Sequence, residues 1–247
     1  MRICKPHPNR IPQLRSLWKL VFGDEDAFLD LFFREAFSPD RCSCAYEADD
    51  LAGMLYWLPC GDYAYIYAVA THPDHRGKGI CRQLMEAAHK EISRQGYAGA
   101  ILYPQEEGLR AMYRKMGYCH ETTLRELVCT AGGTPVALTQ ISPREYFRLR
   151  PGLLPSNAPA QGSPFPELAE SWRFFRSREL MLAATVRGQR LLAAEYLGPE
   201  ELAPGILKTL GAEEGIFRCP GGQTPFAMVC PLKEDALLPD YFSFPLD

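Results

Sequence analysis

A basic, glycine-containing turn stands directly before a predicted amphipathic helix. Residues 76–82 read RGKGICR, and they follow an apolar stretch, YAYIYAVAT, at residues 63–71. Glycines at the start of a helix let consecutive backbone N–H groups approach one anion, and the helix dipole favours negative charge there. Lys78 and Arg82 add positive charge at the rim. The combination predicts a binding site for a pyrophosphate group.

Two common phosphate-binding motifs do not fit this turn. A P-loop needs Gly-Lys followed by Ser or Thr, whereas Gly77-Lys78 is followed by Gly79. A dinucleotide-binding turn needs three glycines, and Arg82 occupies the position of the third.

The cysteines and the histidines near the turn do not predict a metal centre. Cys42 and Cys44 are the tightest cysteine pair, but no second pair follows at zinc-ligand spacing. His72, His75 and Cys81 lie close in sequence, but the glycines between them are better explained by an anion site. We therefore expect no metal, and we expect the nine cysteines to be reduced thiols in a cytoplasmic protein.

The overall composition is that of an ordinary globular protein. The formal net charge is −3 and the pI is about 6.0, whereas a general nucleic-acid binder is usually basic. No apolar run reaches the roughly 18 to 20 residues that span a bilayer, and the N-terminus lacks the apolar region of a secretory signal. We expect no nucleic-acid partner and no membrane association.

The elements around the turn predict an α/β (α+β) domain over residues 1–130. Hydrophobic periodicity separates helices from strands, and the strand at 63–71 is apolar on both faces, as a central strand is. We expect, in order, helices over 11–22 and 24–37, a hairpin of 44–46 and 54–58, the central strand 63–71, a helix over 81–95, a strand at 99–104, a short helix over 109–116 and a strand at 123–130.

Residues 131–247 predict a second, smaller α+β domain. Ser142 begins a helix with a capping box, and residues 151–166 form a loop rich in Pro, Gly and Ser. No Arg-Gly-x-Gly turn recurs here, so we expect no second phosphate site. The further elements expected are a helix around Trp172, a hairpin of 181–186 and 191–196, a helix over 206–210 and strands at 215–219 and 225–232.

The turn and its surroundings resemble the GCN5-related N-acetyltransferase (GNAT) superfamily. The signature of that family is Gln/Arg-x-x-Gly-x-Gly/Ala after a central strand, and Arg76, Gly79 and the small Cys81 meet it here. A later aromatic motif ending in Gly-Phe or Gly-Tyr is matched by MYRKMGY at residues 112–118. The resemblance covers about residues 10–130 and implies the GNAT fold, a mixed central sheet flanked by helices.

A finer likeness points to the enhanced-intracellular-survival type of GNAT enzyme. Residues 71–84 and 106–127 carry it, and that type adds a GNAT-like second domain and a third domain. Too few residues follow Thr130 for both, so we expect residues 131–247 to be a degenerate GNAT-like half in a C-terminally truncated relative.

The resemblance implies that acetyl-CoA is the co-substrate. Backbone groups of Val69, Ala70 and Thr71 would contact the pantetheine arm and the thioester. Arg76 marks the motif, although its side chain could brace the turn instead. The residues implied at the pyrophosphate are Gly77, Lys78, Gly79, Ile80, Cys81 and Arg82.

Tyr113, the tyrosine of MYRKMGY, is the implied general acid that protonates the leaving thiolate. The alternative is a core tyrosine on the same apolar stripe as Leu109 and Met116. A backbone N–H at Val69 or Ala70 would stabilise the oxyanion. Direct attack by the amine requires no acyl-enzyme, so Cys81 is not expected to be a nucleophile.

The general base is less constrained. In the enhanced-intracellular-survival type the terminal carboxylate of the chain reaches the active site, which makes Asp247 a hypothesis here. The alternative is an ordinary exposed terminus. Glu47, Glu106 and Glu107 are other carboxylates to consider, and Glu106 departs from the Asn that many GNAT enzymes have near this position.

We therefore expect an N-acetyltransferase that acts on a primary amine of a small molecule or peptide. The sequence is also compatible with a homo-oligomer. The rival hypothesis is a non-catalytic acyl-CoA-binding regulatory module. An acceptor cleft could be lined by aromatic residues, although most of these are expected in the core: Trp18, Phe32, Phe33, Tyr46, Tyr56, Trp57, Tyr65 and Tyr67.

Overall fold

The computed structural model describes residues 1–169 and 171–243, and the chain separates into two compact units. The first unit comprises residues 1–120 together with 228–237. The second comprises residues 121–227 together with the segment from Leu238 onward. The domain boundary expected at residue 130 stays a prediction. No helix of the described chain is long and apolar enough to cross a membrane.

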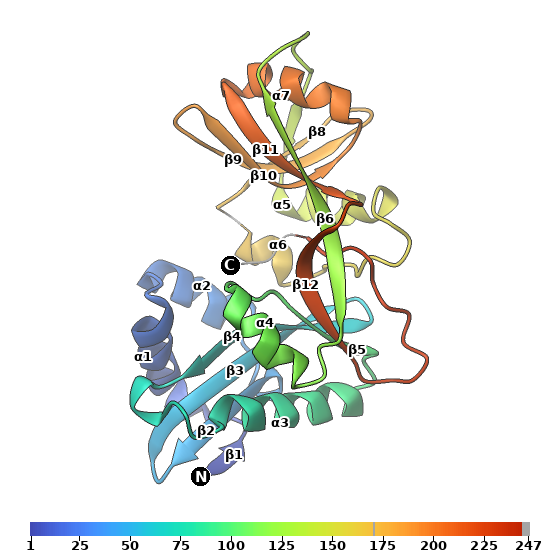
Figure 1. Ribbon diagram of the computed structural model, residues 1–247. Coiled ribbons are helices and arrows are strands. Elements are labelled where there is room, and N and C mark those ends of the chain that lie inside the picture. The colour runs from blue at the N-terminus through green and yellow to red at the C-terminus, as the bar shows by residue number, and fades with distance from the viewer. Residues whose placement is uncertain (170, 244–247) are drawn as a thin grey trace. The chain divides into compact units, whose positions relative to one another are not determined.

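The first unit is built on a mixed sheet (Figure 1). Its only parallel pair among the described strands is β4 with β5, and the other neighbours are antiparallel. A parallel pair needs a crossover, which α3 supplies. In spatial order the strands are β1 (Arg2–Cys4), β2 (Cys42–Glu47), β3 (Asp50–Cys60), β4 (Tyr63–Thr71), β5 (Gly99–Leu102) and the end of β12 (Thr224–Pro231).

Helices cover both faces of this sheet (Figure 1). Helices α1 (Ile11–Phe22) and α2 (Asp26–Glu35) pack on one face, and α3 (Ile80–Arg94) and α4 (Glu107–Arg114) pack on the other. Short 3₁₀ helices precede α1, β2 and α3, at Pro8–Arg10, Pro39–Arg41 and Pro73–His75. The predicted fold class, a mixed sheet flanked by helices, is confirmed.

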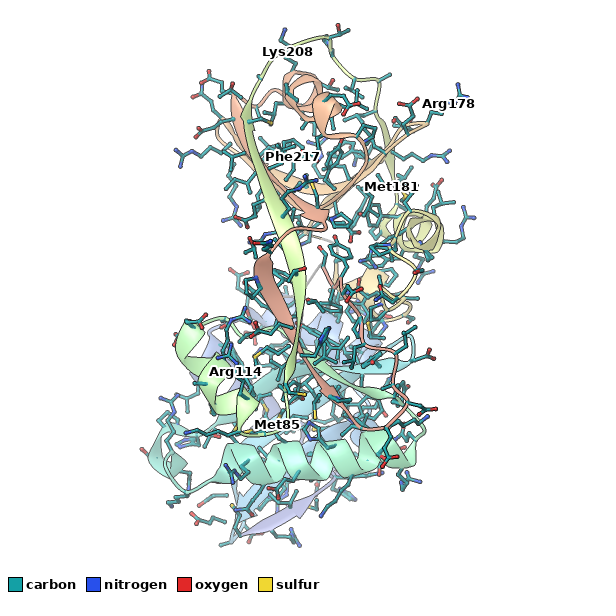
Figure 2. All side chains as sticks on the ribbon, turned by 45° about the vertical axis from the view of Figure 1, so that its right-hand side comes forward. Met85, Arg114, Arg178, Met181, Lys208 and Phe217 are labelled. Carbon is teal, nitrogen blue, oxygen red and sulfur yellow. The ribbon has the colours of Figure 1, made fainter. Side chains whose placement is uncertain are left out.

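Alternation along β3 and β4 divides the core of the first unit into two layers. Trp57 and Ile66 face α3, where Met85 projects toward the sheet (Figure 2). Tyr56 and Tyr67 face the other way, and their rings lie 5.3 and 5.8 Å from the ring of Trp18 on α1. This alternation explains why the sequence of β4 is apolar throughout.

The second unit contains a series of neighbouring strands with helices packed against them. Strands β10 and β11 are parallel and are connected through α7, and Phe217 lies in the core beside α7 (Figure 2). The strand order is β6 (His120–Thr130), β11 (Glu214–Pro220), β10 (Arg190–Leu197), β9 (Met181–Arg187), β8 (Arg173–Arg176) and β7 (Thr139–Ile141). The helices are α5 (Pro143–Leu149), α6 (Phe165–Leu168) and α7 (Ala203–Leu210), with 3₁₀ turns at Arg150–Gly152 and Glu200–Leu202.

The expected helix around Trp172 is wrong. The helical segment, α6, ends at Leu168, and the chain then enters β8. Phe174 and Phe175 are adjacent and both buried, which a strand covered on two faces permits, and β8 pairs with both β7 and β9.

The last strand also differs from expectation. Residues 225–232 were expected among the elements of the second domain. In the structure Met228–Pro231 pair with Gly99–Leu102, so the end of β12 completes the sheet of the first unit. This long-range pairing leaves no local sequence signal.

Candidate active site

Strands β4 and β5 diverge in the middle of the first unit. Their parallel register begins at Tyr63–Gly99 and has its last pair at Tyr65–Ile101. Strand β5 ends at Leu102, whereas β4 runs on to Thr71 while paired with β3. In the register of the described strands, the β5 side of β4 therefore has no strand partner beyond Tyr65. Backbone N–H and C=O groups there need other partners, which an extended ligand can supply.

A β-bulge lies in this diverged part of β4. Tyr67 pairs with Tyr56 and Ala70 pairs with Met54, so β4 has one more residue than β3 in the interval. Ala68, inside the bulge, has a φ of +49°, a conformation that residues other than glycine adopt rarely. Bulges are common beside active sites because they change the direction of backbone groups. The bulge is adjacent to Val69 and Ala70, the residues expected at the thioester.

The glycine turn has the geometry of an anion cradle. Gly77 and Gly79 have φ values of +78° and +74°, and the space beside both α-carbons is open. Gly79 is the N-cap of α3 and offers no side chain, and the first intrahelical bond runs from the Gln83 N–H to the Gly79 carbonyl at 3.2 Å. The N–H groups of residues 80–82 therefore have no intrahelical acceptor. A phosphate group can take that place.

The charged residues at the turn divide into paired and unpaired cations. The Lys78 Nζ lies 2.9 Å from the Glu47 Oε2, and the same oxygen lies 2.7 Å from the His75 Nδ1. The hydrogen bond from Lys78, aided by that from His75, lowers the pKa of the Glu47 carboxyl. Arg76 and Arg82 are exposed, and neither forms an ion pair within residues 1–169 and 171–243.

Cys81 is placed at the first turn of α3 as a small, partly buried residue. Burial raises the pKa of its thiol to about 11, so the thiol is protonated at neutral pH. A protonated thiol is a poor nucleophile. The side chain packs against the core between α3 and the sheet, which suits the space-limited last position of the motif.

Tyr113 lies on α4 and is 7% exposed. Its ring packs at 64° to the ring of Tyr118, with centroids 5.7 Å apart, and the Tyr118 hydroxyl lies 3.0 Å from the His89 Nε2. Val69 and Cys81 pack against the same hydrophobic cluster that contains Tyr113. The structure thus brings the bulged strand, the start of α3 and Tyr113 to one face of the first unit.

The carboxylates considered as general bases differ in position and in their ion-pair partners. Glu47 is engaged by Lys78 and His75 at the end of β2. Glu106 and Glu107 are exposed at the start of α4, and Glu107 pairs with Arg110, Oε2 to Nε, at 3.1 Å. Asp247 lies outside the described residues, so its role stays a prediction.

The aromatic residues considered for an acceptor cleft are mostly core. All except Phe33 are buried, and Trp18, Phe32, Tyr56 and Tyr67 form one ring cluster between α1, α2 and the sheet.

A feature that the sequence reasoning missed is a cavity of about 480 Å³ on the α1 side of the turn. Its lining includes Gln13 and Ser16 of α1, Asp50 of the β2–β3 hairpin, and His72 and His75. The sequence shows the acidic run EADD at residues 47–50, but it does not show that this run lies beside the glycine turn. Among the described residues no three His, Cys, Asp or Glu side chains could hold a metal ion.

Comparison with known proteins identifies this arrangement. Residues 2–120 match the family model described as an acetyltransferase (GNAT) domain. Residues 2–120 belong to the GNAT superfamily. The resemblance to the GNAT superfamily expected from the turn and the MYRKMGY motif is confirmed for this domain.

Known relatives of this GNAT chain include the N-acetyltransferase Eis of Mycobacterium tuberculosis (strain ATCC 25177 / H37Ra). It is 39% identical over 59 residues, which are 24% of this chain and 14% of the relative. Eis of Mycobacterium bovis (strain BCG / Pasteur 1173P2) matches to the same extent. The match therefore spans a small part of these curated relatives.

Solved structures resemble the GNAT chain over both units. A GCN5-related N-acetyltransferase from Kribbella flavida superimposes with a TM-score of 0.72 at 16% identity, covering 94% of this chain and 72% of that one. Eis1 from Mycobacterium abscessus gives a TM-score of 0.67 at 11% identity, covering 94% and 74%. At these identities the likeness concerns the fold.

Proposed function

We propose that this protein transfers an acetyl group from acetyl-CoA to a primary amine of a small molecule or peptide by direct attack. The observation that carries the proposal is the cradle at Gly77 and Gly79, with its positive φ values, open space and helix N–H groups that lack an intrahelical acceptor. It lies in the same unit as the edge of β4 that, among the strands described, has no strand partner beyond Tyr65.

The residues present fit two parts of acetyl-CoA, the pyrophosphate and the pantetheine arm that carries the thioester. Bound acetyl-CoA supplies an activated thioester. The N–H groups of residues 80–82 and the turn at 77–79 would hold its pyrophosphate, with Arg76 and Arg82 as nearby cations. The diverged edge of β4 at Val69, Ala70 and Thr71 would bind the pantetheine arm as an added strand binds a sheet edge.

Three steps follow for the residues of this chain. A backbone N–H at Val69 or Ala70 donates to the carbonyl oxygen as negative charge develops on it. Tyr113 gives its proton to the departing thiolate. For the base that deprotonates the amine, we take the α-carboxylate of Asp247 or a water molecule as candidates, because Glu47 is committed to Lys78 and His75.

The experiment is calorimetric binding of acetyl-CoA followed by a free-thiol release screen with polyamines, aminoglycosides, amino acids and peptides. Binding with amine-dependent thiol release is expected. Binding without release from any amine would favour the rival function, a non-catalytic acyl-CoA-binding regulatory module. No binding of acetyl-CoA or CoA would overturn the assignment of the cradle.

A further inference from the structure

An acidic hairpin tip lies beside the proposed anion cradle. The tip between β2 and β3 reads EADD at residues 47–50, and the backbone next to it is joined to the turn region by a hydrogen bond from the His72 N–H to the Ala52 carbonyl at 2.9 Å. Carboxylates next to a site for a pyrophosphate are unfavourable unless they are neutralised. The Asp49 Oδ1 lies 3.2 Å from the Arg10 Nη2, whereas Glu47 is the carboxylate that contacts Lys78 and His75 of the turn.

One oxygen of Glu47 receives two donors from the turn. The Lys78 Nζ is 2.9 Å away and the His75 Nδ1 is 2.7 Å away, both from Oε2. A nitrogen this close to a carboxylate oxygen has a proton between the two, so the His75 ring donates rather than accepts. Lys78 is the residue between the two cradle glycines, and its contact with Glu47 directs its charge to that carboxylate.

We propose that Glu47 competes with the pyrophosphate of CoA for Lys78 and thereby lowers the affinity of the cradle. The inference rests on the function proposed above, since it assumes that the cradle binds CoA. The side chains of Glu47 and Lys78 are 39% and 48% exposed, and ion pairs this exposed cost little to break. Lys78 can therefore leave Glu47 for a ligand phosphate, after which Glu47 and the phosphate repel each other.

The consequence is faster release of CoA after acetyl transfer. Interaction with the pyrophosphate is the same in acetyl-CoA and in CoA, so uniformly tight binding would slow product release without assisting the chemical step. A carboxylate that takes back Lys78 weakens both complexes equally. Glu47 is on this argument a residue that tunes binding, and it takes no part in the chemical step.

The test measures CoA affinity by calorimetry and CoA release by stopped flow for the wild type and Glu47→Gln. The glutamine keeps the size and an acceptor oxygen but removes the charge. We expect Glu47→Gln to bind CoA about three- to tenfold more tightly, mainly through slower dissociation. S-acetyl-pantetheine, which has no pyrophosphate, should bind both proteins equally.

Two controls separate this effect from general charge. Asp49→Asn changes the net charge equally on the same hairpin tip but removes the partner of Arg10, and it should change CoA affinity less than twofold. In a Lys78→Gln background, Glu47→Gln should gain clearly less affinity for CoA, because only the repulsion between Glu47 and the phosphate is left to remove. Weaker CoA binding by Glu47→Gln would overturn the proposal and make Glu47 a brace of the turn. An equal gain with and without Lys78 would also overturn it. A wild type that does not bind CoA would instead overturn the proposed function.

Discussion

Tyr65 of β4 and Ile101 of β5 form the last pair of the parallel ladder, and the candidate site begins where that pairing ends. Beyond it β4 holds the bulge at Ala68 and reaches the glycine turn through Thr71 and His72. The same strand therefore supplies an edge that lacks a strand partner among the described strands, and it leads directly into the proposed anion cradle. A ligand with an extended arm and a diphosphate matches both features of this one connection.

Gly79→Ala should weaken acetyl-CoA binding by about tenfold or more, a loss of roughly 1.4 kcal/mol or more in binding free energy. The φ of +74° strains an L side chain by about 1–2 kcal/mol, and a methyl group would occupy the open space that a phosphate needs. Calorimetry with acetyl-CoA measures the change in affinity, and urea unfolding measures the loss of unfolding free energy that the strain causes.

Gly96→Ala is the matched control for that substitution. Gly96 follows the other end of α3, has a φ of +90° and also has open space beside its α-carbon. It should show a similar loss of unfolding free energy with unchanged acetyl-CoA affinity. If both variants lost affinity equally, general destabilisation would explain the result and the cradle would not.

Tyr113→Phe should lower kcat by roughly 10²- to 10⁴-fold, the range for loss of a general acid, while acetyl-CoA still binds. Tyr118→Phe is the control, because it removes a buried hydroxyl from the neighbouring ring, bonded to His89. We expect it to reduce stability by about 1 kcal/mol and to change kcat much less. Steady-state kinetics with the amine found in the screen distinguishes the two, and unchanged turnover in Tyr113→Phe would show that Tyr113 is a core tyrosine only.

Cys81 should resist alkylation at neutral pH. Because burial raises the pKa of its thiol to about 11, roughly one molecule in three thousand carries the thiolate at pH 7.5. The alkylation rate should therefore rise about tenfold per pH unit up to about pH 11. Peptide mass mapping after brief iodoacetamide treatment measures it, with the exposed Cys119 as the fast-reacting reference.

Cys81→Ala should retain acetyl transfer, because direct attack by the amine uses no enzyme thiolate. Loss of turnover with acetyl-CoA binding intact would require an acyl-enzyme at this position and would contradict the mechanism proposed here.

The sequence predicted the features that depend on neighbouring residues. The helix periodicity, the doubly buried strand at 63–71 and the glycines at 77 and 79 each have a local cause, and each is present in the structure. The bulge at Ala68 has no such cause, because it depends on how β4 pairs with β3. The pairing of Lys78 with Glu47 joins residues 31 positions apart, so no spacing rule could indicate it. The strand at Arg173–Arg176 was mistaken for a helix because RFFR is too short to show a period.

A buried ionic network connects several segments of the second unit. Arg150 and Glu195 are 2% and 0% exposed. The Arg150 Nε donates to the Glu195 Oε2, and the Arg150 Nη2 donates to the Glu195 Oε1. The hydroxyls of Tyr146 and Tyr241 also donate to Glu195, at 2.7 and 3.0 Å. Glu195 thus joins α5, the turn after it, and the segment before the C-terminus to strand β10.

Arg150→Met should cost about 3–5 kcal/mol of unfolding free energy, because it leaves the Glu195 carboxylate buried without its cation. Arg150→Met with Glu195→Leu should be less destabilised than the single variant, since an apolar pair carries no uncompensated charge. Tyr241→Phe should cost about 1.5–3 kcal/mol, the value of a hydrogen bond to a charged group. Urea unfolding of the full chain, followed by far-UV circular dichroism, measures all three. A double variant no more stable than Arg150→Met would mean that the network contributes through the tyrosine hydroxyls rather than through charge compensation.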